Sequence, residues 1–292
     1  MRPSRRMLLA GAAATFAIRP VRAASQRVAT LDWALLETLL AMGIVPVAAA
    51  ELVLFRQVAV DPEVPARVAD LGLRGLPNFE ALARAKPDLI FNSAYYVAAE
   101  PKLRLVAPVE TLSIYARGGR PYDRAEEAAI RIGAATGWPE AAQELIAVTR
   151  DGLAGHRATL AQHASRPLLV INLGDARHFR VFGPDSMFGE VIARLGLANA
   201  WTEPTSYAAS APIGLEALAR FADATLVILP PVPPDAHRLL PQSAVWSALP
   251  SVRENRVLLL GSMNPFGGLP TAARFARLLT QALLQPEGAG FG

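Results

Sequence analysis

Arginine and aromatic side chains gather in segments that follow predicted strands, where they could hold a ligand. Arg74 lies between two glycines in a mostly apolar stretch, and Tyr95-Tyr96 closely follows the predicted strand 89–92. Open α/β sheets bind ligands at the ends of their strands. Arginine beside aromatic rings suits a ligand with anionic oxygens and a substantial apolar body, although each side chain taken singly is equally compatible with ordinary packing. This pattern selects Arg74, Tyr95, Tyr96, Trp201, Tyr207, Ser210 and Phe266.

The sequence offers no convincing catalytic set. It contains no cysteine, no Gly-x-Ser-x-Gly elbow and no glycine-rich phosphate loop after a predicted strand. His156 and His163 share a face of one predicted helix, but two turns separate them, which is too far for one metal site. No His-Glu-x-x-His spacing occurs either. We therefore expect a binding protein that is not an enzyme and has no metal ligands of its own.

Two pieces of sequence recur in the same order and indicate two related halves. The pentapeptide Glu-Ala-Leu-Ala-Arg begins at Glu80 and again at Glu216, and a strand-like run follows each copy. Glu37 and Glu190 each lie six residues before a glycine that is followed by an aliphatic residue. Glu80 and Glu216 fall in the first turn of their predicted helices, where the helix dipole favours a carboxylate. The alternative is that they form a pair of docking acids for a membrane partner.

Apolar runs alternate with helical patterns, which is typical of an α/β fold with mostly parallel sheets. Asn78 is well placed to cap the helix 79–86, and Gly43 to end the helix 34–42. Residues 53–71 contain two prolines and are expected to be irregular. The predicted strands are 28–31, 45–49, 89–92, 168–172, 226–229 and 257–260, and the predicted helices are 34–42, 79–86, 122–136 and 139–162.

One long helical pattern divides the chain. It starts at Pro139, since proline is favoured at the first position of a helix, and Arg166-Pro167 ends it. We predict two Rossmann-like lobes joined by a single long connector helix; a long surface helix inside one domain is the alternative. The predicted parts are a signal peptide at 1–23, an N-terminal α/β lobe at 24–138, the connector helix at 139–165 and a C-terminal α/β lobe at 166–292.

The N-terminus has the layout of an export signal. A basic start containing Arg5-Arg6 precedes twelve mostly apolar residues, and small residues lead to a predicted cleavage after Ala23. The arginine pair suggests the twin-arginine route, with an ordinary basic start as the alternative. Residues 1–23 contain five arginines and no acids, so the rest of the chain has 24 basic against 25 acidic residues. This balance removes the argument for a nucleic-acid partner. We expect a monomeric periplasmic protein.

Short motifs carry a family pattern along nearly the whole chain, from Arg27 to about Leu284. They lie at 28–33, 70–74, 77–80, 86–88, 178–188, 199–201, 266–268 and 274–275. With these motifs the chain resembles the ferric-hydroxamate siderophore-binding proteins of bacterial iron importers. The Val-Phe-Gly-Pro run at 181–184, followed by Asn-Ala-Trp at 199–201, is fairly specific to that branch. The wider class of helix-hinged (class III) periplasmic binding proteins shares the motifs at 77–80 and 86–88.

The resemblance implies a ligand site in a shallow cleft between the lobes. In this family an arginine and a tyrosine hydrogen-bond the hydroxamate oxygens around the iron, and Arg74 and Tyr96 match those positions. The siderophore fills the coordination sphere of the iron, so the resemblance implies no cofactor and no protein ligand to the metal. Glu80 and Glu216 match the acids that similar proteins present to arginines of the permease. The resemblance also places Asn92, Met187 and Asn264 at the cleft.

Several pocket positions depart from the family pattern. Residues with smaller side chains stand where relatives carry tryptophan, and Phe266 stands where they carry a tyrosine. Losing large rings is expected to widen the cleft or make it more polar, and so to alter the preferred ligand. The substituted tryptophan positions are Val58, Asn92, Ala208 and Asn264.

The expected function is capture of an iron(III) siderophore, with hydroxamate as the expected chemistry, and its delivery to an inner-membrane ABC permease. The first alternative is the same fold binding cobalamin, haem or a non-hydroxamate siderophore. The second alternative is an exported scaffold protein or an α/β enzyme.

Overall fold

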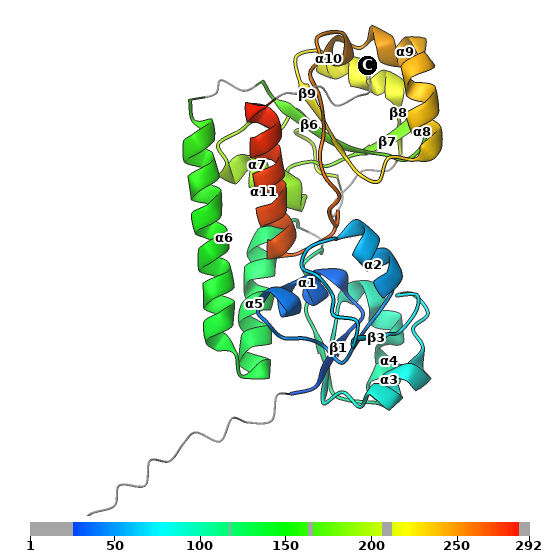
Figure 1. The fold of residues 1–292 in the computed structure, drawn as a ribbon, viewed down its shortest axis with the longest axis vertical. Coiled ribbons are helices and arrows are strands. Elements are labelled where there is room, and N and C mark those ends of the chain that lie inside the picture. The colour runs from blue at the N-terminus through cyan, green and yellow to red at the C-terminus, as the bar shows by residue number, and fades with distance from the viewer. Residues whose placement is uncertain (1–25, 117, 163–165, 206–211, 286–292) are drawn as a thin grey trace, which may run out of the picture.

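A computed structural model describes residues 26–116, 118–162, 166–205 and 212–285, which form two α/β lobes (Figure 1). The first lobe contains a five-stranded, all-parallel sheet with the order β3-β2-β1-β4-β5. Its strands are β1 (Val28–Thr30), β2 (Ala48–Ala49), β3 (Ala69–Asp70), β4 (Leu89–Asn92) and β5 (Val109–Thr111). Its helices are α1 (Trp33–Ala41), α2 (Leu52–Val58), α3 (Phe79–Ala85), the 3₁₀ helix η1 (Ala94–Ala99), α4 (Glu100–Leu103) and α5 (Pro121–Thr136).

The second lobe contains a mixed five-stranded sheet with the order β10-β9-β6-β7-β8. Its strands are β6 (Leu168–Leu173), β7 (His178–Val181), β8 (Ile213–Gly214), β9 (Thr225–Leu229) and β10 (Val257–Leu259). Its helices are α7 (Met187–Arg194), η2 (Leu215–Phe221), α8 (Pro234–Leu239), η3 (Leu240–Gln242), α9 (Ala244–Ala248), α10 (Pro250–Arg253) and α11 (Leu269–Leu284). The helix α6 (Pro139–Leu160) lies between the two sheets in sequence.

The two sheets share one strand order, which supports the two related halves expected from the sequence. Written from its other edge, the second sheet reads β8-β7-β6-β9-β10 and matches the first strand by strand. The repeated pentapeptide occupies equivalent places, because α3 leads into β4 and η2 leads into β9. The halves differ where β7 turns back antiparallel to β6. There Asp175 accepts the backbone N–H groups of Arg177 and His178, which stabilises a tight turn.

Local signals set the ends of several helices as the sequence predicts. The side chain of Asn78 accepts the backbone N–H of Ala81 at the start of α3, at 2.9 Å. Asp32 caps α1 in the same way, accepting the N–H groups of Ala34 and Leu35. Gly137 ends α5 with a φ of +75°, a conformation that costs glycine little. These caps confirm the predicted starts and ends of α3 and α5 to within a residue.

The segment expected to be irregular contains a helix. Residues 52–58 form α2, and the irregular part is confined to the proline-containing residues that follow it. Leu52 and Phe55 are fully buried, and the ring of Phe55 meets Trp33 edge-on with centroids 5.3 Å apart. Burial against α1 therefore decides the structure of this segment, which has weak helical signals of its own.

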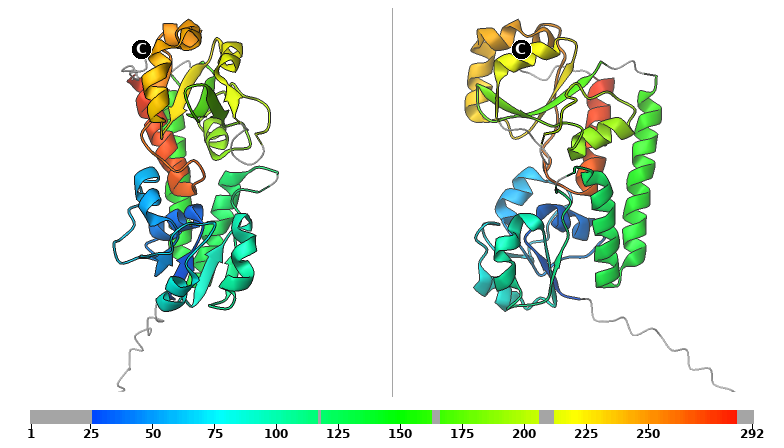
Figure 2. Two further views of the ribbon diagram at one scale, coloured as in Figure 1. Left: turned by 90° about the vertical axis from the view of Figure 1, so that its right-hand side faces the viewer. Right: turned by 180° about the vertical axis from the view of Figure 1, so that it is seen from behind.

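The two lobes are joined by a layer of helices. The long helix α6 runs past both lobes with α5 and α11 beside it (Figures 1 and 2). Its 22 residues give it a length of about 33 Å. One continuous core crosses the layer, with buried side chains from each part of the molecule, among them Leu35, Tyr122, Ile146, Phe188 and Phe275. The predicted connector helix is therefore joined by a second link between the lobes, because α11 of the second lobe packs against α1 of the first lobe. None of the described helices is long and apolar enough to cross a membrane.

Candidate ligand-binding site

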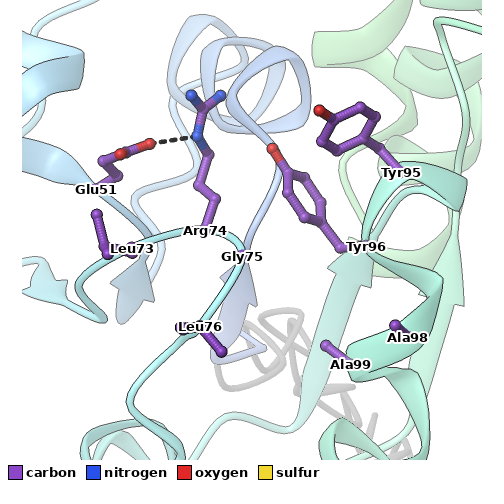
Figure 3. Close-up of a pocket in the computed structure, with 9 residues that line it drawn as sticks. All are labelled: Glu51, Leu73, Arg74, Gly75, Leu76, Tyr95, Tyr96, Ala98 and Ala99. Carbon is purple, nitrogen blue, oxygen red and sulfur yellow. Dashed lines mark hydrogen bonds and ion pairs between the residues drawn. The ribbon is translucent and has the colours of Figure 1, made fainter.

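A cavity of about 430 Å³ opens at one end of the first sheet (Figure 3). Three segments form it: Glu51 (two residues after β2), the loop after β3 and the helix η1 after β4. Because these strands are parallel, their carboxyl ends lie at one edge of the sheet, where the sequence predicts a site. The nine lining residues are Glu51, Leu73, Arg74, Gly75, Leu76, Tyr95, Tyr96, Ala98 and Ala99. The structure thus brings Arg74, Tyr95 and Tyr96 together, as predicted.

The guanidinium group of Arg74 is fixed on two sides. Its Nε donates to Oε2 of Glu51 at 2.5 Å, and its central carbon lies 3.8 Å from the centroid of the Trp33 ring. Trp33 is itself held, because its Nε1 donates to the carbonyl oxygen of Ala50 at 3.0 Å. A stacked guanidinium with one N–H engaged loses little further freedom on binding a ligand. Its two Nη atoms point away from Glu51 and stay available (Figure 3).

Tyr95 and Tyr96 complete the polar part of the cavity. Their rings meet edge-on with centroids 5.1 Å apart, and the hydroxyl of Tyr96 points the same way as the Nη atoms of Arg74 (Figure 3). Tyr95 is exposed and Tyr96 half-buried. Burial raises the pKa of Tyr96 to about 12, against a smaller lowering by the charge of Arg74. The Tyr96 hydroxyl therefore stays protonated at neutral pH and can donate a hydrogen bond beside Arg74.

Exposed aliphatic side chains surround these polar groups. Leu73 is 61% exposed and Leu76 is 81% exposed, on either side of Arg74 and Gly75 in the loop after β3. Val97 of η1 is exposed next to the tyrosines. Apolar surface of this kind around convergent donors is typical of a ligand site. Leu73 and Leu76 were not predicted as site residues, although both lie close to the predicted arginine in sequence.

Glu51 is the charged lining residue that was not predicted. It lies two residues after β2, so the rule that selects Arg74 and Tyr96 would have selected it too. The predicted strand 45–49 ends at the same residue as β2, and the signal for Glu51 was therefore present in the sequence.

Two residues assigned to the cleft by resemblance lie inside the protein. Met187 is fully buried in the core that the lobes share, so the structure contradicts its predicted contact with ligand. Asn264 is 2% exposed, and its side chain donates to Glu37 and accepts the N–H of Phe266. It belongs to the junction between the lobes, which corrects the second assignment.

Asn92 is also buried, directly beneath the tyrosines. Its Nδ2 donates to the carbonyl oxygen of Tyr96 at 3.4 Å, and its Oδ1 has no partner among the described residues. It therefore supports the segment that carries Tyr96 and does not reach the cavity, contrary to the prediction. Val58, at the end of α2, does not line the cavity either.

The remaining predicted residues lie apart from this cavity or outside the described residues. Trp201 packs on Phe221 with ring centroids 5.7 Å apart. Phe266 is 44% exposed and meets Tyr115 edge-on with centroids 5.6 Å apart. Neither lines the cavity, and their contact with ligand stays a prediction. Tyr207, Ala208 and Ser210 fall outside the described residues.

A buried glutamate joins the first lobe to the start of α11. Glu37 accepts hydrogen bonds from Asn264 Nδ2, the backbone N–H of Gly268 and the hydroxyl of Thr271, at 2.9–3.0 Å. Burial raises the pKa of Glu37 to about 7, although these three hydrogen bonds favour its charged form. Tyr115 adds a bond from its hydroxyl to the carbonyl oxygen of Gly267 at 2.7 Å. Hydrogen bonds between buried polar groups thus hold the residues around the start of α11 against the first lobe.

Glu80 and Glu216 are exposed in the first turns of α3 and η2. The side chain of Glu80 is 79% exposed and lies 3.3 Å from Arg84. An ion pair this exposed contributes little to stability. Both carboxylates are accessible to another protein, one from each lobe.

Comparison with known proteins places the chain in a described family. Residues 28–263 match the family model "Periplasmic binding protein". The iron(3+)-hydroxamate-binding protein FhuD of Escherichia coli is 30% identical over 257 residues, 88% of this chain and 86% of that protein. The Fe(3+) dicitrate-binding periplasmic protein FecB of E. coli is 27% identical over 247 residues, 81% of this chain and 77% of that protein. A crystal structure of Vibrio cholerae FhuD with Fe³⁺-Desferal superposes with a TM-score of 0.85 at 26% identity, covering 90% of this chain and 99% of that one.

Proposed function

The chain belongs to the periplasmic binding protein family, and we propose that it captures an iron(III) siderophore outside the cytoplasm, with hydroxamate as the iron-binding chemistry. The observation that carries the proposal is the convergence of Arg74 and Tyr96 in one open cavity. Both are hydrogen-bond donors, and hydroxamate oxygens bound to iron(III) keep lone pairs that accept such bonds. The likeness to a hydroxamate-binding relative over 88% of the chain supports the same ligand class.

The cavity suits binding without chemistry on the ligand. The Nη atoms of Arg74 and the hydroxyl of Tyr96 would donate to the oxygens around the iron, while Leu73 and Leu76 would contact the organic backbone of the siderophore. The iron would stay in the ligand's own coordination sphere. The described residues contain no group of three or more histidine, cysteine or acidic residues that could hold a metal. We propose a receptor that binds without catalysis and acts as a monomer.

Delivery to an inner-membrane ABC permease completes the proposed role. Glu80 and Glu216 are the proposed contacts for permease arginines, because they are exposed and come from different lobes. Charges at the rim of an interface steer association and fix its register. Export would use residues 1–23, with the pair Arg5-Arg6 directing it to the twin-arginine route.

A tryptophan-fluorescence titration tests the ligand. Trp33 contacts Arg74, so an absorbing ligand in the cavity should quench its emission. The processed protein is titrated with a ferric trihydroxamate, with the iron-free siderophore as the matched control, and with cobalamin and haem as competing ligands. Saturable quenching by the ferric complex alone supports the proposal. Saturable quenching only by cobalamin or haem would show that the proposed ligand is wrong and would support a receptor for that other ligand. No response to any of them would favour a scaffold protein.

A further inference from the structure

Glu51 lies at the cavity in an unusual backbone conformation. Its φ of +56° is left-handed, which is uncommon for a residue with a side chain. A bond from its N–H to the carbonyl oxygen of Gly72, at 2.7 Å, ties it to the loop that carries Arg74. The side chain is 19% exposed and faces the cavity. Strained residues of this kind persist where the surroundings fix them, and they concentrate at binding sites.

The charges around the cavity cancel. Of the nine lining residues, only Glu51 and Arg74 carry a formal charge at neutral pH, and they form an ion pair. The phenol of Tyr96 is neutral there, and burial raises its pKa further from neutrality, to about 12. Asp32 lies near Arg74, and burial raises its pKa, but it adds no positive charge in either protonation state. A single arginine would attract anions, whereas this arginine comes with its own counter-charge.

We propose that Glu51 sets the charge preference of the cavity by offsetting the charge of Arg74, so that the site does not select anionic ferric hydroxamates as an arginine alone would. The inference rests on the proposed siderophore-binding function and adds a residue that determines specificity. Iron(III) with three hydroxamates is neutral, so a pendant ammonium makes the complex cationic and a pendant carboxylate makes it anionic. Arg74 alone would repel the first and attract the second, and the Glu51 carboxylate offsets both effects. Glu51 also positions Arg74 by accepting a hydrogen bond from its Nε. The test must therefore separate this positioning role from the effect of the Glu51 charge.

Substitution by glutamine separates them. Glu51→Gln keeps a side-chain oxygen that can accept the Arg74 Nε bond, and it removes the negative charge. If Glu51 only positions Arg74, the variant should bind all ferric hydroxamates almost as the unaltered protein does. If Glu51 sets the charge preference, the order of affinities should change. Glu63 is an acid of the same lobe outside the cavity, so Glu63→Gln is the control for a change in overall charge.

The test uses three ligands that share the same ferric trihydroxamate group and differ in net charge. They are the ferric complexes of desferrioxamine with a free amine, of its N-acetyl derivative and of its N-succinyl derivative, with net charges of +1, 0 and −1. Affinities are measured by tryptophan quenching in low salt, where electrostatic contributions are least screened. Because the charges of Glu51 and Arg74 cancel, we expect the unaltered protein to bind the amine and succinyl complexes with similar affinity. Glu51→Gln should shift the ratio of these affinities about tenfold in favour of the succinyl complex, equivalent to about 1.4 kcal/mol, and Glu63→Gln should leave the ratio unchanged.

The outcomes are distinguishable. An unchanged ratio between amine and succinyl complexes in Glu51→Gln overturns the charge preference and leaves siderophore binding standing. An equal loss of affinity for all three complexes also overturns it and makes Glu51 a positioning residue only. If the unaltered protein binds none of the three, the proposed function fails and this inference fails with it. Circular dichroism melts of each variant establish that the compared proteins are folded.

Discussion

Replacing Arg74 with alanine is expected to weaken the binding of a ferric hydroxamate about 10- to 150-fold. Glu51 occupies Nε of Arg74, so only the Nη groups are left to donate to a ligand. Hydrogen bonds that involve a charged group contribute about 1.5–3 kcal/mol, and 1.4 kcal/mol corresponds to a factor of ten. The side chain is 28% exposed, so water competes for these donors. We therefore count one such bond and not two.

The assay is the same fluorescence titration, repeated on Arg74→Ala and on a matched control. Arg84→Ala is that control, because Arg84 also pairs with a glutamate but lies on α3 outside the cavity. Arg74→Ala leaves Glu51 without its partner, so thermal unfolding is followed in parallel to separate lost stability from lost affinity. Affinity within twofold of the unaltered protein in Arg74→Ala, or an equal loss in Arg84→Ala, would refute the role given to the guanidinium.

Four further substitutions test the docking acids, the cavity and the junction between the lobes. Glu80→Ala and Glu216→Ala should leave siderophore affinity unchanged and reduce uptake in cells, because both carboxylates are exposed; a matching loss of affinity would contradict a docking role. Tyr96→Phe should weaken binding about two- to tenfold, the range for a neutral hydrogen bond, and its phenol should add no pH dependence between pH 6 and 9 because its pKa is raised to about 12. The folded protein holds the proton of Glu37 more tightly than the unfolded chain does, so stability should fall as pH rises from about 4.5 to 7; urea unfolding at both ends of this range should show a smaller fall in Glu37→Gln.

Local patterns predicted the elements whose signals lie within a few residues. The cap Asn78, the start of α6 at Pro139 and the strand β4 follow from short-range rules, and the structure has them where the sequence predicts. The helix α2 was missed because its burial against Trp33 is a tertiary contact that no neighbouring residue reports. The strand β2 was predicted too long for a similar reason, since only two of its residues pair with neighbouring strands.

The structure brings together some of the residues selected from strand ends, and it buries residues that were placed at the cleft by resemblance alone. Arg74 and Tyr96 follow strands of the first sheet, so topology brings them together whatever fills the rest of the cleft. Met187 and Asn264 were matched by position, but their side chains fill the joined core and the lobe junction. Residue types cannot reveal this difference, because an amide or a thioether suits either a pocket or an interior.

The second sequence correspondence, between Glu37 and Glu190, gains a physical reason from the junctions between the lobes. Glu37 of α1 accepts the backbone N–H of Gly268, just before α11 begins. Glu190 of α7 lies near the backbone N–H of Tyr122 at the start of α5, and this N–H favours its charged form, whereas burial raises its pKa. In each half, the glutamate thus lies at the N-terminus of a helix of the joining layer, where the dipole favours a negative charge. Two such anchors and a shared core resist relative rotation of the lobes. Specificity must then come mainly from groups already in position, such as Arg74 held by Glu51 and Trp33, and less from closure around the ligand.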